Sequence, residues 1–142
     1  MRPSLAICLC AYNEELSIVA KVESLLAMAA AYGPQATVYV YADAPTDQTV
    51  ALLDDYRDRL QLYVSPVRRG KTAGMKLLVG MSQGELIAFT DANVMTDNDG
   101  LVRLAAPFAN PKIGCTSARL VYYNASQSPT AASMPCINAF RP

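Results

Sequence analysis

The chain has 142 residues, 52% of them apolar, which is enough for one globular domain with a full core. Twelve Lys and Arg balance twelve Asp and Glu, so no long-range field attracts the whole molecule to nucleic acid or to an anionic membrane. Histidine is absent. Its absence excludes Ser-His and Cys-His nucleophilic chemistry and the usual zinc sites, and leaves carboxylates, Lys, Arg and Tyr as candidate catalytic groups.

The cysteines and the apolar runs indicate a soluble, cytoplasmic protein. Cys8 and Cys10 lie two apart in one apolar run and Cys115 falls in another, without CxxC spacing, so we expect reduced core residues. The longest uninterrupted apolar stretch, residues 25–32, is far shorter than the roughly 18 to 20 residues that a membrane helix needs. No signal peptide is evident. We therefore expect membrane association only through regions absent from this chain.

The first part of the chain alternates predicted strands and helices. A short apolar run over residues 5–10 predicts a buried strand, and apolar residues spaced by three and four predict a helix over 14–31 with Glu14 and Glu15 in its first turn. Gly33 ends this helix. A second strand is predicted over 37–42, a helix capped by Thr46 or Asp47 through about residue 57, and a third strand over 60–64.

The alternation continues in the second part. The pattern predicts a helix over 71–81, a strand over 86–89, a helix over 99–108 and a long strand over 113–123. Residues 1–123 thus form one α/β domain with an open, mostly parallel, Rossmann-like sheet and helices on both faces. Residues 124–142 are rich in Ser, Pro, Thr and Ala, and we expect an irregular or disordered tail there.

Polar loops follow three of the predicted strands, at Tyr12-Asn13-Glu14, at Asp43 and at Asp91-Ala92-Asn93. In a parallel sheet, ligands bind beyond the carboxyl ends of the strands, so these loops are expected to share one crevice. Asp91 and Asn93 offer hard oxygen ligands of the kind that suit Mg²⁺ or Mn²⁺ bound to nucleotide phosphates. The same pair also occurs in ordinary turns and helix caps, so this element alone is weak evidence.

Asp43 and the basic cluster before the third predicted helix each allow either a ligand-binding role or a purely structural one. Asp43 is positioned like the acid that hydrogen-bonds a nucleoside in many α/β folds, or is a simple turn residue. Arg68, Arg69 and Lys71 cluster where a helix begins, so they meet a diphosphate or form a solvated basic loop.

Two nucleotide-binding motifs are excluded. A P-loop ending in Gly70-Lys71-Thr72 requires glycine at position 65, where this chain has Ser65. No G-x-G-x-x-G follows the first strand, so a dinucleotide-dependent dehydrogenase is disfavoured as well. A nucleotidyltransferase is a further possibility, but this chain lacks the Gly-rich, basic loop expected after the first strand of such an enzyme.

As a set, the four loops make the chain resemble family 2 glycosyltransferases of the GT-A fold over roughly residues 4–123. The matching segments are 11–15, 42–49, 69–76 and 90–93. The resemblance implies a divalent metal, Mg²⁺ or Mn²⁺, held by Asp91 and Asn93, and a UDP- or GDP-linked sugar donor for polysaccharide or glycolipid synthesis. The residues implied at the donor site are Ala11, Tyr12, Asn13, Glu14, Asp43, Arg69, Lys71 and Asp91.

The chain departs from the family pattern at two places. Ala42 and Asn93 stand where the family usually has acids, which removes charge from the cation site. The catalytic base and a Trp-containing acceptor motif fall beyond the matched region, and the chain has no Trp. We therefore expect a donor half without its acceptor half, from a truncated product or a fragment. The alternative is a non-catalytic α/β interaction module that self-associates through surface left uncovered.

Overall fold

The computed structural model describes residues 2–118 and 137–142. The strands are β1 (Leu5–Ala11), β2 (Ala36–Ala42), β3 (Gln61–Val64), β4 (Leu86–Thr90), β5 (Cys115–Ser117) and β6 (Ile137–Phe140). The helices are α1 (Ile18–Tyr32), α2 (Thr49–Asp54), α3 (Lys71–Met81) and α4 (Gly100–Ala105), and the 3₁₀ helix η1 (Ala106–Ala109) follows α4 directly.

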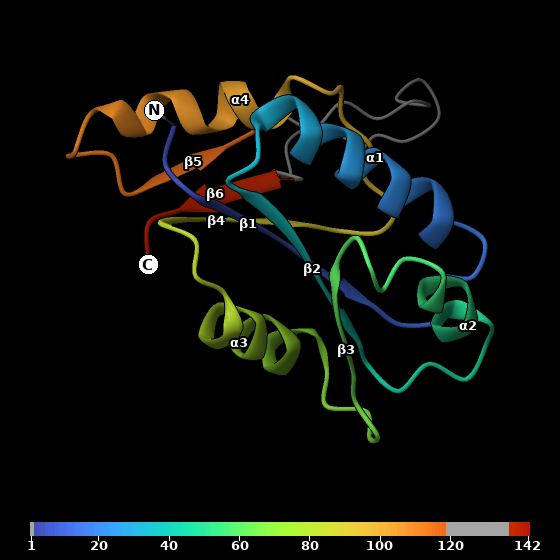
Figure 1. Cartoon of the computed structure of the whole chain (residues 1–142). Helices are drawn as coiled ribbons and strands as arrows, with labels where there is room; N and C mark the ends of the chain where they lie inside the picture. The colour runs from blue at the N-terminus through green and yellow to red at the C-terminus, as the bar shows by residue number, and fades with distance from the viewer. Residues whose placement is uncertain (1, 119–136) are drawn as a thin grey trace, which may run out of the picture.

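The strands form one sheet in the order β3-β2-β1-β4-β6-β5 (Figure 1). The first four are parallel, with Ile7 of β1 in register with Val38 of β2 and Ala88 of β4. Strand β6 is antiparallel to both β4 and β5. The chain leaves β1 toward β2 on one side and reaches β4 on the other, so a topological switch point lies at the carboxyl end of β1.

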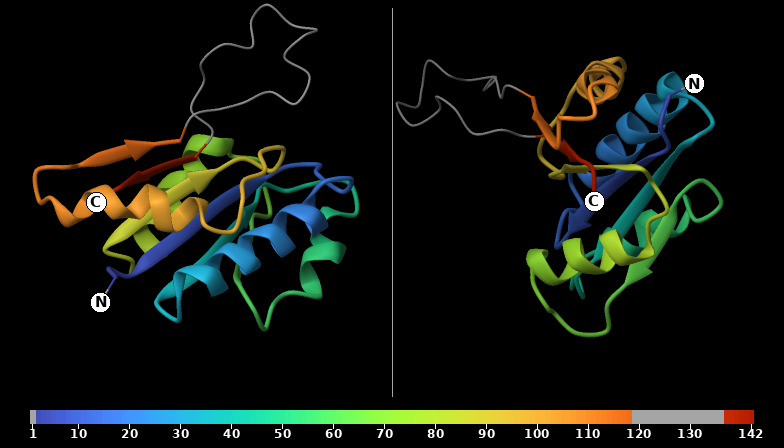
Figure 2. Two further views of the ribbon diagram at one scale, coloured as in Figure 1. Left: turned by 90° about the horizontal axis from the view of Figure 1, so that it is seen from above. Right: turned by 90° about the vertical axis from the view of Figure 1, so that its left-hand side faces the viewer.

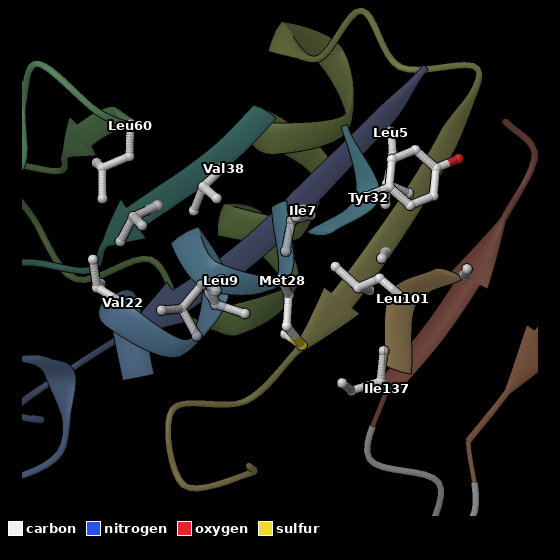
Figure 3. Close-up of a cluster of buried hydrophobic side chains, with 14 of the residues drawn as sticks. Leu5, Ile7, Leu9, Val22, Met28, Tyr32, Val38, Leu60, Leu101 and Ile137 are labelled. Atoms are coloured by element: carbon white, nitrogen blue, oxygen red, sulfur yellow. The ribbon is translucent and has the colours of Figure 1, made fainter. Parts of the chain in front are cut away.

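Helices cover both faces of the sheet, as expected: α1 and α4 lie on one face and α3 on the other (Figure 2). Successive side chains of β1 therefore enter two cores. Ile7 and Leu9 pack with Val22 and Met28 of α1 (Figure 3), whereas Cys8 packs with residues on the α3 side. The near-continuous apolar sequence of β1 reflects this burial on both faces.

The predicted start of the first helix is wrong by four residues. Helix α1 begins at Ile18, and its first turn contains no acidic residue. The backbone N–H groups of Glu14 and Glu15 donate instead to Thr49 Oγ1 (2.8 Å), at the start of α2, and to Asp47 Oδ2 (3.1 Å), in the loop before it. Side chains distant in sequence hold this segment outside the helix. The predicted end at Gly33 is confirmed, with φ of 127°.

The expected irregular tail is wrong for residues 137–140, which form β6, while residues 124–136 lie outside the described part. Ile137 and Ala139 are buried and alternate with half-buried Asn138 and Phe140, the pattern of a strand covered mainly on one face. Four residues of alternation are a weak signal, and the pairing partner β4 lies about fifty residues earlier in the chain. Of the predicted long strand, the described residues show only Cys115–Ser117.

The cysteine prediction is confirmed for Cys8 and corrected for Cys115. All three described cysteines are free, and Cys8 is buried, but Cys115 is exposed on the edge strand β5. Within residues 2–118 and 137–142, no helix has the length and apolar character needed to cross a membrane.

Candidate functional site

A pocket of about 320 Å³ lies where β1, β2 and β4 end and α3 begins. Seven of the residues assigned to the donor or metal site line it: Ala11, Tyr12, Glu14, Asp43, Lys71, Asp91 and Asn93. Four further lining residues were not among those assigned to the donor site: Cys10, Arg68, Gly70 and Ala92. Asn13 and Arg69, which were assigned to it, do not line the pocket.

Asn13 shapes the pocket indirectly by joining two loops. It adopts a left-handed conformation with φ of 51°, which Asn tolerates better than most residues. Its Oδ1 accepts the backbone N–H of Thr46 (2.8 Å), and its Nδ2 donates to Thr46 Oγ1 (3.1 Å). The loop after β1 is thereby held against the loop after β2.

Asp43 is the most heavily bonded side chain of the pocket. Its carboxylate accepts the backbone N–H of Arg69 (2.7 Å), the backbone N–H of Gly70 (2.9 Å) and the Tyr41 hydroxyl (3.0 Å). Although Asp43 lies in one of the polar loops noted in the sequence, it is only 4% exposed, because the loop before α3 folds over it. Burial acts to raise its pKa, but these three hydrogen bonds and the charge of Arg68 outweigh burial, so the pKa is lowered.

Arg68 and Arg69 have separate roles that their adjacency in sequence conceals. Arg69 contributes its backbone N–H to Asp43, whereas the guanidinium of Arg68 lies 3.6 Å from the ring centre of Tyr12. Both Arg68 and Tyr12 line the pocket, so the stacked pair forms one of its walls. The basic cluster in the sequence pointed to this region but not to the residue that faces the pocket.

Lys71 is the first residue of α3 and forms an ion pair with Asp91 at the end of β4. Gly70, just before it, has φ of 86°, a conformation that favours glycine. The side chains of Lys71 and Asp91 are 58% and 46% exposed, so both remain accessible from solvent. A cation and a carboxylate thus stand together at the rim, beside the N-terminus of an eleven-residue helix.

Asp91, Ala92 and Asn93 form a short turn after β4. Ala92 is 5% exposed and packs into the core, while Asn93 is exposed and Asp91 is partly exposed. No cluster of three or more His, Cys, Asp or Glu suited to a metal occurs among the described residues. Asp91 and Asn93 supply two oxygen-bearing side chains, so a divalent cation held there would take its remaining ligands from phosphates and water, as Mg²⁺ commonly does.

Cys10 lines the pocket but is not suited to act as a nucleophile. Burial raises the pKa of its thiol to about 11, and although the charge of Lys71 lowers it, Asp91 and Asp43 raise it further. The thiol is therefore protonated near neutral pH.

A larger cavity of about 630 Å³ lies at the opposite edge of the sheet, near the start of β1 and β4. Its two arginines are already engaged: Arg2 donates to the carbonyl of Tyr32 (2.7 Å) and Arg141 donates to the carbonyl of Phe108 (3.0 Å). This cavity contains none of the strand-end residues. The smaller pocket is therefore the candidate site.

Known proteins similar to this chain are glycosyltransferases. The model of a family described as Glycosyl transferase family 2 matches residues 6–137. The beta-monoglucosyldiacylglycerol synthase of Synechocystis sp. is 30% identical over 129 residues, which are 86% of this chain and 26% of that protein. The enzyme of the same name from Nostoc sp. is 27% identical over 131 residues, 89% of this chain and 28% of that protein. The chain spans about a quarter of the length of these curated relatives.

Solved structures share the fold at low sequence identity. The mannosyltransferase PcManGT from Pyrobaculum calidifontis, in complex with GDP-Man and Mn²⁺, superposes with a TM-score of 0.83 at 21% identity, covering 99% of this chain and 45% of that one. Glucosyl-3-phosphoglycerate synthase from Mycobacterium tuberculosis, in complex with Mn²⁺, UDP and phosphoglyceric acid, gives a TM-score of 0.73 at 15% identity, with coverages of 98% and 56%. The sheet and its helices are those of GT-A glycosyltransferases, and because the family model matches most of the chain, this protein belongs to glycosyl transferase family 2.

Proposed function

We propose that the pocket at the ends of β1, β2 and β4 binds a nucleoside-diphosphate sugar together with a divalent cation. The chain would thus supply the donor side of a sugar transfer in glycolipid or polysaccharide synthesis. The observation that carries the proposal is the convergence of three strand-end loops and the start of α3 on one pocket at the switch point of the sheet.

The nucleoside is assigned to the Tyr12 and Asp43 side of the pocket. Tyr12 offers an aromatic face beside Arg68. A carboxylate has about four lone-pair positions. Three of these positions on Asp43 already accept protein donors, which leaves about one lone-pair position for a hydroxyl or N–H of the ligand. Asp43 thus has two roles: it fixes the basic loop and it contributes to the pocket surface.

The diphosphate is assigned to the other side of the pocket, near Lys71. The Lys71 ammonium is paired with Asp91 at the rim, and phosphate oxygens are a competing partner for it. Asp91 and Asn93 would hold the cation, with the phosphates completing its coordination. When bound, the cation would stabilise negative charge on the departing nucleoside diphosphate.

Glycolipid synthesis is supported by the two relatives named beta-monoglucosyldiacylglycerol synthase. The solved relatives are complexes with GDP-Man or UDP and with Mn²⁺. Both guanine and uracil nucleotides are therefore candidates for this chain. The catalytic base is not assigned to any residue here.

Calorimetric titration of UDP, GDP and their sugar conjugates, with and without Mn²⁺, tests the proposal directly. We expect binding by one nucleotide class that strengthens with Mn²⁺. The mass in solution is to be measured in parallel. A folded, self-associating protein that binds none of these ligands would overturn the proposal and favour the interaction module.

Two variants make the titration specific. Asp91→Asn removes a carboxylate from the pocket rim, and Asp97→Asn removes another ion-paired carboxylate, the partner of Arg103, that does not line this pocket. We expect the first to weaken Mn²⁺-dependent binding and the second to leave it unchanged.

A further inference from the structure

Lys21 is a lysine on the apolar side of α1, with no exposed surface. Its neighbours on that side of the helix, including Ile18, Val22 and Leu25, are fully buried apolar residues. An apolar side chain would satisfy packing at this position, and a buried ammonium is unfavourable unless it is hydrogen-bonded. The charge at position 21 therefore requires a reason other than packing.

The ammonium of Lys21 reaches both ends of the turn that carries Asp91 and Asn93. Among its contacts, Nζ donates to Thr90 Oγ1 at 2.8 Å and to the backbone carbonyl of Val94. Thr90 is the last residue of β4, and Val94 is the first residue after Asn93. One buried cation on α1 thus joins the two residues that flank the turn.

Bonds within the turn extend this anchor to Asp91 itself. The backbone N–H of Val94 donates to the Asp91 carbonyl at 3.2 Å, and the Thr90 hydroxyl is 3.5 Å from the same oxygen, a long contact. Ala92 is held in the core. Asn93 and part of Asp91 are left on the solvent side. The inner face of the turn is fixed, while its polar face is presented to the pocket.

We propose that Lys21 is a positioning residue that holds the Asp91–Asn93 turn in the geometry needed to bind the cation and diphosphate. The inference rests on the proposed function of the pocket. Lys21 does not line the pocket, so its effect on a ligand passes through the residues that it contacts, Thr90 and Val94 among them. Groups that orient metal ligands without touching the metal typically change metal affinity about 10- to 100-fold when they are removed.

Hydrogen exchange tests the anchoring independently of any ligand. Lys21→Met removes the ammonium and keeps an unbranched side chain of similar length. We expect protection of the Val94 amide to fall about tenfold or more, relative to that of Leu9 in β1, since its hydrogen bond closes the anchored turn. Leu25→Ala, a fully buried change one turn further along α1, is the control, and its effect on Val94 is expected to match its effect on Leu9.

Nucleotide titration tests the consequence for binding, using whichever of UDP or GDP the wild-type chain binds. We expect Lys21→Met to reduce the gain in affinity on adding Mn²⁺ about tenfold or more, with Mn²⁺-free affinity within about twofold of wild type. Leu25→Ala is expected to keep the full Mn²⁺ effect. If Lys21→Met leaves Val94 exchange or the Mn²⁺ effect unchanged, the role of Lys21 is overturned, and the proposed function of the pocket is not affected. A wild-type chain that binds neither nucleotide overturns the proposed function and the ligand part of this inference, while the exchange data still decide whether Lys21 holds the turn.

Discussion

The substitution Asp43→Ala removes a buried carboxylate on which three hydrogen-bond donors converge. The Tyr41 hydroxyl is buried, and leaving such a donor unsatisfied costs about 1 to 3 kcal/mol. The N–H groups of Arg69 and Gly70 are in partly buried bonds and can reach water, so each loses about 1 kcal/mol. Release of a buried charge offsets part of the loss, which leaves a destabilisation of roughly 2 to 4 kcal/mol.

Urea unfolding at pH 7, followed by circular dichroism, measures this loss. We expect a lower midpoint with an unchanged slope, because the native fold and the surface exposed on unfolding stay the same. The control is Asp58→Ala, which truncates an exposed aspartate in the turn that follows α2. It should change the free energy of unfolding by less than about 0.5 kcal/mol. If Asp43→Ala were as stable as Asp58→Ala, the convergence of donors on Asp43 would not stabilise the fold.

The pH dependence gives an independent check on Asp43. Burial acts to raise its pKa, but its hydrogen bonds and Arg68 lower it overall, below the unfolded value of 3.8. A carboxyl group with a lowered folded-state pKa stabilises the fold fully above the unfolded pKa, and this contribution is lost as the pH falls through the folded pKa. The stability difference between wild type and Asp43→Ala should therefore be constant above about pH 5 and shrink below pH 4. A difference that grows in acid would contradict this assignment.

Three further outcomes are expected. Asp91→Asn should leave the free energy of unfolding within about 1 kcal/mol of wild type, because its ion pair is solvent-exposed, while weakening Mn²⁺-dependent nucleotide binding in calorimetry. Gly74→Ala should destabilise the protein by about 1 to 3 kcal/mol in urea unfolding, since the added Cβ would lie 2.4 Å from the Tyr41 side chain. Gly80→Ala in the same helix should stabilise the protein by about 0.5 to 1 kcal/mol, because its Cβ would point into open space. Cys8, whose thiol pKa burial raises to about 12, should resist iodoacetamide at pH 8 until the chain is unfolded, as peptide mass mapping would show.

Each of these has a result that contradicts it. A large stability loss in Asp91→Asn would mean that the turn depends on the ion pair. Equal effects of Gly74→Ala and Gly80→Ala would show that α3 does not pack closely on Tyr41. Rapid labelling of native Cys8 would place its strand nearer to solvent than the structure does.

The elements that the sequence predicts well are those with strong local signals. The apolar run of β1 and the helix α3, bounded by Gly70 and Ser82, appear where they were expected. The start of α1 and the strand β6 were not predicted, because contacts with distant segments decide them. Asp47 and Thr49 bind the segment before α1, and β6 depends on pairing with β4.

The residues of the pocket follow the same division. That loops after β1, β2 and β4 meet could be inferred from the alternation of strands and helices, since parallel strands end at one edge of a sheet. The alternation, the four loop motifs and the absence of His are all properties of the linear sequence, and they determined the fold class, the family and the excluded chemistries. Burial of Asp43, the choice of Arg68 over Arg69 at the pocket wall, and the reach of Lys21 to Thr90 and Val94 were decided only by tertiary structure. The physical reason is that burial and hydrogen bonding depend on which distant segments cover a residue, and no local pattern records that.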